Sequence, residues 1–166
     1  MLPRPRPIPP GPGQESVWDY PRPARCEPTS AHVEIVFGGR TIASSRAAYR
    51  VLETSHPPSY YLPPGDCDTD AFVSTMGGSL CEWKGQAVYF DVLAGGKRAP
   101  RAAWAYPRPT PEFAAMAGYI AVYPGLMDAC FVDGERVVPQ EGGFYGGWIT
   151  SKVVGPFKGP PGTRFW

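Results

Sequence analysis

The sequence lacks the features that mark most membrane and nucleic-acid-binding proteins. No apolar run approaches the roughly 20 residues that a helix needs to cross a bilayer, and the N-terminus has no apolar core of a secretory signal. Lys and Arg total 16 against 15 Asp and Glu, so no surplus of charge favours nucleic acid or an anionic membrane. We therefore expect a cytoplasmic protein with neither nucleic acid nor a membrane as its partner.

Paired cysteines and the common catalytic motifs are missing as well. Four cysteines occur, but no two of them form a C-x-x-C pair, which argues against a zinc ribbon. In a chain of 166 residues this spacing gives no disulfide framework, so free thiols are expected. Phosphate-binding, dinucleotide-binding, zinc-protease and nucleophile-elbow motifs are absent, so the sequence contains no motif typical of these large enzyme classes. We expect no cofactor.

One acidic stretch, DCDTD at 66–70, has the alternating carboxylates that suit a hard cation such as Ca²⁺ or Mg²⁺. As an EF-hand loop it fails, because Ala71 and Gly77 stand where a glycine and a bidentate glutamate are required. A nucleotidyl-transfer site would need a Gly-Ser turn upstream, whereas the Gly-Gly-Ser of residues 77–79 comes downstream. We interpret the stretch as a solvated turn and predict no metal site.

What the chain has in plenty is proline, glycine and aromatic residues. The 22 prolines and 20 glycines favour turns and short strands over long helices, while 22 aromatic residues argue against disorder. Prolines crowd residues 1–14, which predicts a proline-rich arm, flexible or docked; its P-x-x-P pattern also suits an interaction ligand. Residues 15–166 are predicted to form a single β domain with an aromatic, Gly/Pro-rich C-terminal segment.

Alternation of apolar and polar residues predicts the strands. Residues 32–37 and 41–44 flank a Gly-Gly-Arg turn and predict a hairpin whose buried face carries Val33, Ile35 and Phe37. Residues 87–93 and the stretch up to Tyr106 predict a second hairpin. Further strands are predicted at 119–123, at 128–132 and after the Asp133-Gly134 turn.

Helix signals are few. Thr110, Pro111 and Gly118 frame a two-turn helix over residues 111–117, and residues 45–52 are a candidate for a second short helix. The predicted fold is therefore a small, mainly β, antiparallel domain with one or two short helices.

A proline-braced strap, ETSHPPSYYLPPGD at 53–66, carries the first candidate site. Proline fixes its own φ and restricts the residue before it, so this stretch is stiff, irregular and not a helix interior. With C-E-W-K-G at 81–85 it supplies groups that transfer protons or attack electrophiles. If the two segments enclose a shared hollow, the candidate catalytic residues are Glu53, His56, Lys84 and Cys81.

Each of these residues also has a purely structural interpretation. A buried cysteine is often an inert apolar residue, and Cys81 and His56 form a reactive pair only within hydrogen-bond reach of each other. A single histidine is often held in a turn by its neighbours. Glu53 can instead cap backbone donors or pair with Arg50.

Aromatic residues are numerous enough to wall a pocket as well as to fill a core. Trp and Tyr next to glycines, as at residues 144–148, form apolar clefts with polar tips that suit a flat organic ligand. The predicted ligand-binding residues are Tyr60, Tyr61, Trp104, Tyr106, Tyr119 and Trp148.

Six sequence blocks follow one another along the chain: V-W-D-Y-P-R-P near 17–23, V-L-E-T-S-H-P-P-S-Y-Y-L-P-P at 51–64, C-E-W-K-G-Q-A-V-Y at 81–89, A-W-A-Y-P at 103–107, G-Y-I-A-V-Y-P at 118–124 and G-G-W-I-T-S-K-V-V-G-P-F-K-G-P-P-G-T at 146–163. In this order they resemble the bacterial family numbered 427 among the domains of unknown function. The resemblance runs from about residue 15 to the end. It implies a compact antiparallel β domain similar to the β-tent folds, in cytoplasmic proteins of bacteria and fungi.

The resemblance implies little about activity. β-tent relatives such as methionine sulfoxide reductase B hold zinc with two C-x-x-C pairs, which this chain lacks, so no structural zinc is expected. A nucleotidyltransferase-like label attached to the family finds no support in the stretch 66–70. His56 belongs to the longer bacterial form of the strap. The family's polar motif residues fall here on Glu53, Tyr60, Tyr61, Cys81, Lys84, Trp104, Tyr106 and Tyr119.

Two functions remain open. The first is a cofactor-independent acid/base enzyme acting on a small organic molecule in an aromatic-lined pocket, with Glu53 or His56 moving a proton and Lys84 stabilising negative charge. In this hypothesis the aromatic residues around Trp104 and Trp148 hold the substrate. The alternative is a non-catalytic small-molecule-binding or protein-interaction module that uses the same cleft or the proline-rich arm.

Overall fold

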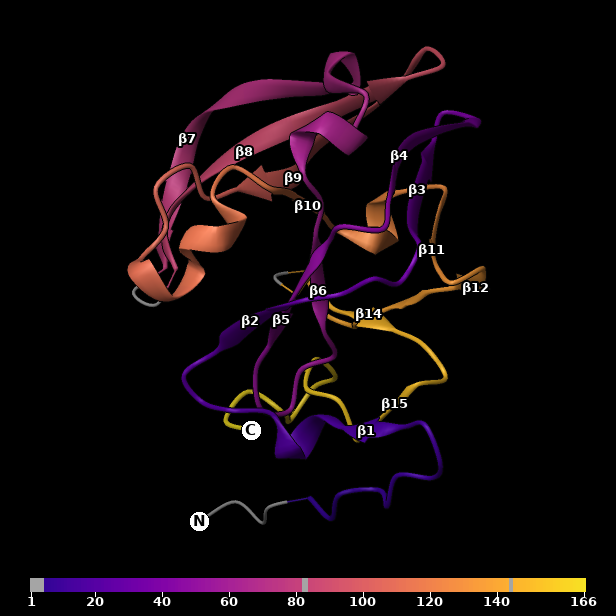
Figure 1. Ribbon diagram of the computed structural model, residues 1–166, viewed down its shortest axis with the longest axis vertical. Coiled ribbons are helices and arrows are strands. Elements are labelled where there is room, and N and C mark those ends of the chain that lie inside the picture. The colour runs from indigo at the N-terminus through magenta and orange to yellow at the C-terminus, as the bar shows by residue number, and fades with distance from the viewer. Residues whose placement is uncertain (1–4, 82–83, 144) are drawn as a thin grey trace.

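The computed structural model describes residues 5–81, 84–143 and 145–166, except for the side chains of residues 76–81. The described chain is mainly β and contains several antiparallel sheets, as predicted. Figure 1 shows two sheets in the upper part of the molecule, a smaller sheet across the middle, and both termini at the lower end.

The first four-stranded sheet carries the candidate site. Its order is β10-β9-β8-β7 and all its pairs are antiparallel. The predicted second hairpin is confirmed as β8 and β9, whereas β7 was not predicted, because its Gly-Gly-Ser segment has low β propensity. The strands are β7 (Phe72–Cys81), β8 (Gly85–Ala94), β9 (Lys97–Ala105) and β10 (Ile120–Val122).

The second four-stranded sheet has the order β12-β11-β3-β4 and contains the predicted N-terminal hairpin. Val33, Ile35 and Phe37 are at most 1% exposed, so the predicted buried face is confirmed. The strands are β3 (Val33–Phe37), β4 (Arg40–Ser45), β11 (Ala129–Val132) and β12 (Glu135–Arg136). The largest apolar cluster joins this sheet to one face of the first sheet.

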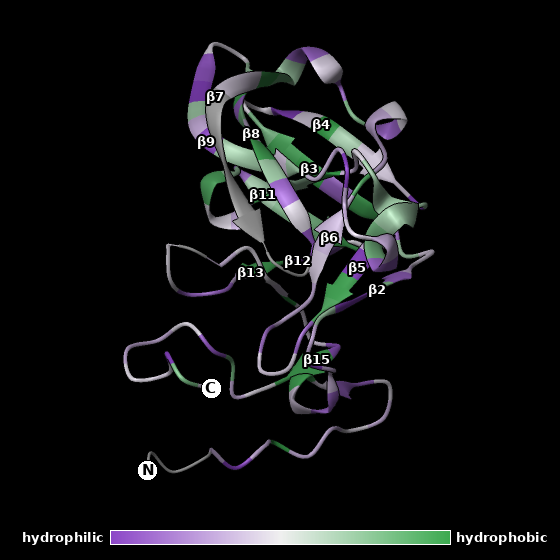
Figure 2. Ribbon diagram, turned by 90° about the vertical axis from the view of Figure 1, so that its left-hand side faces the viewer, coloured by the Kyte–Doolittle hydropathy of each residue, from purple (hydrophilic) through white to green (hydrophobic). Residues whose placement is uncertain are grey.

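A three-stranded sheet, β2-β5-β6, connects the strap to the rest of the fold. It consists of β2 (Arg25–Pro28), β5 (Tyr49–Leu52) and β6 (Ser59–Tyr61). The candidate helix over 45–52 is wrong, because β5 pairs with a strand on either side and buries Val51 and Leu52. Figure 2 shows the later part of β5 in green, the colour of hydrophobic residues. Leu62 and Ile120 exchange two backbone hydrogen bonds of 2.8 Å, which tie this sheet to β10.

Short elements complete the described chain. The predicted helix after Thr110 is present as the 3₁₀ helix η4 (Pro111–Met116), which buries Phe113 and Met116. No helix in the described ranges is long and apolar enough to cross a membrane. The other short elements are η1 (Val17–Asp19), η2 (Pro64–Asp66), η3 (Thr69–Ala71), η5 (Pro124–Leu126), the parallel pair β1 (Glu15–Ser16) and β15 (Val153–Val154), and the antiparallel pair β13 (Val138–Pro139) and β14 (Trp148–Ile149).

The N-terminal arm lies along the C-terminal segment in the residues described. The backbone N–H of Ile8 donates to the carbonyl of Gly155 at 2.9 Å, and the side chain of Gln14 donates to the carbonyl of Ser151 at 2.7 Å. β1 then pairs with β15, which continues this contact into the domain.

Strand alternation decides which residues of the first sheet face the site. Ala103 and Val122 point into the large core, whereas their neighbours Trp104 and Ala121 belong to a second apolar cluster on the opposite face. Tyr89 is the cross-strand partner of Trp104, and Trp104 is the partner of Ala121. The opposite face of this sheet therefore carries a row of side chains that is available to line a site.

Candidate functional site

A cavity of about 380 Å³ opens over this row of side chains, and we call it the strap cavity. Glu53 and His56 reach it from the strap, and Lys84 reaches it from the residue before β8. The two segments that the sequence singled out thus share one hollow. Six of the predicted site residues line it: Glu53, His56, Tyr61, Lys84, Trp104 and Tyr106.

The aromatic wall follows from the register of the strands. Tyr89 and Trp104 are directly opposed on β8 and β9, so their rings meet on the same face of the sheet. Trp104 packs against Tyr123 with 4.6 Å between ring centroids, and its Nε1–H donates to the hydroxyl of Tyr61 at 3.0 Å. Because Tyr61 and Trp104 are each less than a tenth exposed, this wall is held by packing before any ligand binds.

Tyr60 and Trp148 do not line the strap cavity. The strap becomes a regular strand at β6, so Tyr60 points to the opposite face from Tyr61. Tyr60 packs against Trp148 in the large core, with 5.0 Å between ring centroids. Trp148 is 1% exposed, and its Nε1–H has no hydrogen-bond partner in the described part of the chain.

Tyr119 and Cys81 stand apart from the cavity for different reasons. Tyr119 packs edge-on against Tyr49, with 5.6 Å between centroids, and faces another surface hollow. Only the backbone of Cys81 lies within the described structure, where it pairs with Gly85 at the end of β7. The side chain of Cys81 lies outside the described residues, so the Cys81–His56 pair stays a prediction.

The strap reverses direction in a tight turn between Glu53 and His56. The backbone N–H of His56 donates to the carbonyl of Glu53 at 3.0 Å, and Ser55 adopts a left-handed φ of +72°. Such a conformation costs a non-glycine residue roughly 1–2 kcal/mol. Backbone bonds offset this cost, because Ser55 donates to Val17 at 3.0 Å and accepts from Lys158 at 2.9 Å.

Gln140 determines which ring nitrogen of His56 carries the proton in the neutral imidazole. Its Oε1 accepts from the backbone N–H of Gly147 at 3.1 Å, and its Nε2 donates to the carbonyl of Lys158 at 2.8 Å. These two backbone partners leave only one orientation for the amide. The same Nε2 lies 3.2 Å from His56 Nδ1, which must therefore accept a hydrogen bond. In the neutral ring the proton is then on Nε2.

The proton on Nε2 faces the candidate carboxylate. His56 Nε2 lies 3.6 Å from Glu53 Oε2, and the two side chains are 17% and 23% exposed. Burial, together with the positive charges of Lys158, Arg22 and Lys84, lowers the pKa of His56 to about 4. The imidazole is therefore neutral at neutral pH, and it offers Glu53 or a ligand a hydrogen-bond donor rather than a charge.

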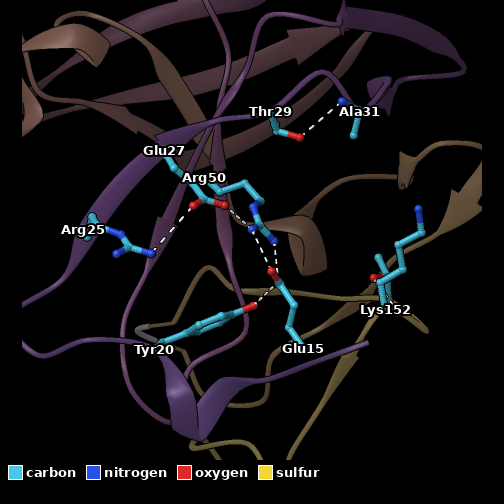
Figure 3. A network of polar contacts seen from close by, with 9 residues as sticks. Glu15, Tyr20, Arg25, Glu27, Thr29, Ala31, Arg50 and Lys152 are labelled. Carbon is cyan, nitrogen blue, oxygen red and sulfur yellow. Dashed lines mark hydrogen bonds and ion pairs between the residues drawn. The ribbon is translucent and has the colours of Figure 1, made fainter. Parts of the chain in front are cut away.

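Arg50 does not pair with Glu53, so that structural alternative is wrong. Strand alternation places Arg50 on the other face of β5, where Nη1 lies 2.8 Å from Glu15 Oε1 and the guanidinium also binds Glu27. Figure 3 shows Arg50 between these two carboxylates, with the hydroxyl of Tyr20 donating to Glu15 at 2.8 Å. Arg50 thus binds carboxylates that do not line the cavity, whereas Glu53 does line it.

The alternating aspartates form a turn held by neighbouring side chains. Asp66 accepts from the hydroxyl of Ser45 at 2.6 Å, while Asp68 pairs with Arg40 and accepts from the backbone N–H of Asp70. Among the described residues, no three His, Cys, Asp or Glu side chains are grouped closely enough to hold a metal ion.

The sequence did not single out Gln140 or Lys158, which close the cavity from the C-terminal segment together with Tyr145 of the aromatic and glycine-rich stretch 144–148. The available signal for this close approach was the glycine pair 146–147. A Cβ on Gly146 would lie 2.4 Å from Cη2 of Trp104, so only glycine allows the backbone to approach the aromatic wall this closely.

A family model described as Domain of unknown function (DUF427) matches residues 25–133. The chain belongs to this family. The DUF427 match includes Glu53, His56 and Lys84, whereas Gln140 and the rest of the C-terminal segment lie beyond it. Comparison with curated proteins gave no match. The strap cavity therefore combines residues from the family region with residues that follow it.

Proposed function

We propose that this DUF427 protein is a cofactor-independent acid/base enzyme that acts on a small organic molecule in the strap cavity. The observation that carries the proposal is the meeting of Glu53, a neutral His56 and Lys84 in one hollow. A volume of about 380 Å³ is within the range of roughly 300–1,000 Å³ typical of small-molecule sites.

In this proposal Glu53 is the general base. Its Oε2 takes a proton from a carbon next to a carbonyl group, and the electron pair moves onto the carbonyl oxygen. The carboxyl proton exchanges with solvent, and the same carboxyl group then protonates the carbon while the electron pair returns from the oxygen. His56 is a positioning residue, because its Nε2–H faces Glu53 and its Nδ1 is already occupied by Gln140.

The charge balance of the cavity supports this assignment. Lys84 and Lys158 both line it, whereas Glu53 is its only carboxylate among the described lining residues. Two ammonium groups in a partly enclosed site favour an oxygen that gains negative charge during the reaction. The substrate binds with its carbonyl oxygen toward these lysines and its flat part against Trp104.

Solvent exchange tests the proposal with a panel of compounds. The protein is incubated in D₂O with small ketones, aldehydes and keto acids, and loss of C–H signals is followed by proton NMR. We expect at least one compound to exchange, and Glu53→Gln to slow its exchange by about 100-fold or more. Tyr119→Phe is the matched control and should exchange normally, because Tyr119 lies outside the cavity. Full exchange by Glu53→Gln would contradict the role of Glu53.

A non-catalytic binding module is the second candidate, and the number of aromatic rings favours it. A ligand present at 100 times its Kd stabilises the folded state by about 2.7 kcal/mol, which a thermal-shift screen detects. Two results together would favour this function: some compounds stabilise the wild type and Glu53→Gln equally, and no compound of the panel shows exchange. The described rings are Tyr61, Tyr89, Trp104, Tyr106, Tyr123 and Tyr145.

A further inference from the structure

A second hollow of about 460 Å³ adjoins the strap cavity, and we call it the side lobe. Four residues line both spaces, namely Tyr89, Tyr123, Gln140 and Tyr145. The two hollows are therefore neighbouring parts of one cleft, with three tyrosine side chains at their junction.

The chemistry of the wall changes from one part of the cleft to the other. The strap cavity carries Glu53, His56 and two lysines, whereas the side lobe is built from Leu126, Pro139 and glycine backbone. Leu126 is 49% exposed at the end of η5, which leaves an apolar side chain open at the lobe. A hollow of this kind suits an apolar, flat group that slides between side chains and bare backbone.

Arg101 is the charged residue among the described lining residues of the side lobe. Its guanidinium lies 4.4 Å from the ring centroid of Tyr89, in a cation–π contact. The side chain is therefore held over a tyrosine that faces both parts of the cleft. A fixed, exposed guanidinium at the rim favours a ligand that carries negative charge.

An irregular backbone conformation sets the direction of the Arg101 side chain. The register of β8 and β9 shifts between Phe90 and Val92, and opposite this irregularity Arg101 adopts a left-handed φ of +48°. Its backbone N–H donates to Oδ1 of Asp91 at 2.9 Å, which holds the strained conformation in place. Strain retained at the edge of a cleft is a feature that functional sites often share.

We propose that the side lobe is a second subsite, which binds a flat aromatic group bearing a carboxylate. The ring lies against Leu126 and Tyr145, and the carboxylate pairs with Arg101. As the place for the non-reacting part of a substrate, this subsite rests on the function proposed above. The binding itself does not require Glu53.

Isothermal titration with 2-naphthoate and with the uncharged 2-naphthamide tests the subsite. Wild-type protein should bind both compounds saturably, and 2-naphthoate more tightly. Arg101→Gln should weaken 2-naphthoate about tenfold and leave 2-naphthamide nearly unchanged, because only the charged contact is lost. Leu126→Asp should weaken both compounds, since it places a carboxylate in the apolar lobe.

Arg164→Gln is the matched control, because its guanidinium also lies over a ring, that of Phe165 at 5.6 Å, but outside the cleft. It should change neither affinity, and circular dichroism should show all variants folded. Absence of saturable binding, or equal 2-naphthoate affinity in wild type, Arg101→Gln and Leu126→Asp, would overturn the subsite. Glu53→Gln separates the two proposals, since it should slow the exchange reaction by about 100-fold or more and leave 2-naphthoate affinity unchanged.

Discussion

Gln140 donates an Nε2–H to His56 Nδ1 across 3.2 Å, and it thereby sets the tautomer of a residue 84 positions earlier in the chain. A ring whose Nδ1 is occupied and whose Nε2 carries the proton is a donor in the cavity, not a base. In the proposed reaction this division of roles leaves Glu53 as the proton acceptor of the pair.

The pKa of His56 makes stability depend on pH in a defined window. Burial lowers the pKa of His56 to about 4 in the folded state, against about 6.5 in an unfolded chain. Between these values the unfolded state binds more protons, so stability is full above pH 6.5 and falls as the pH drops toward 4. We expect the loss to be about 3 kcal/mol, measured by urea denaturation across this range.

His56→Asn should remove this loss of stability between pH 6.5 and pH 4, because Asn cannot titrate. Its side-chain carbonyl can still accept a hydrogen bond from Gln140. His32→Asn is the control and should keep the loss of stability that His56 causes, since it leaves the strap and the buried imidazole intact and removes contacts with Ser44 and Glu34 outside the cavity. With only two histidines in the chain, NMR titration of their ring protons gives the pKa of His56 directly. A folded-state pKa of His56 near its ordinary value would contradict the neutral donor.

A methyl group added at Gly146 should disturb the aromatic wall. Gly146→Ala would place a Cβ 2.4 Å from Cη2 of Trp104, so the ring or the backbone must move. Overpacking of this kind costs about 1–3 kcal/mol, which urea denaturation measures. Gly143→Ala is the matched control, because a Cβ there meets nothing within 4 Å. Equal stability of the two variants would show that the close approach to Trp104 is not maintained in solution.

Arg50 should contribute more to stability than Arg25, although both contact Glu27. The side chain of Arg50 is 15% exposed and binds two carboxylates, whereas that of Arg25 is 62% exposed and lies 3.8 Å from Glu27. We expect Arg50→Met to cost about 1–3 kcal/mol at pH 7 and Arg25→Met at most about 0.5 kcal/mol.

Acid titration separates this ion pair from simple packing. The hydrogen bond from Arg50 lowers the pKa of Glu15 below its usual 4.5, so the pair stabilises the fold above pH 4.5 and is lost as the pH falls through the lower folded-state pKa. The difference between wild type and Arg50→Met should therefore shrink when unfolding is measured at pH 3. A constant difference would indicate that Arg50 acts through its apolar stem.

Local patterns in the sequence were enough for the regular hairpins and for part of the cavity lining. The alternation around Ile35 marks its buried face without tertiary information, and the two proline pairs mark the segment from which Glu53 and His56 reach the cavity. The local pattern of residues 45–52 fits a short helix. Pairing of β5 with β2 and β6, which the local pattern does not show, makes its residues a strand instead.

The remainder depended on contacts between distant segments. Tyr60 and Tyr61 look equivalent in sequence, and only the formation of β6 sends one into the core and the other into the cavity. Gln140 carries no local sign of its role, because its partners are a turn at His56 and the backbone near Lys158.

The family match ends at residue 133, between two sets of residues that line the cavity. Glu53 and Lys84 lie within the matched region, whereas Gln140, whose amide faces the imidazole, lies after it. A substitution confined to the later segment therefore changes the hydrogen bond to His56 and leaves both charged groups in place.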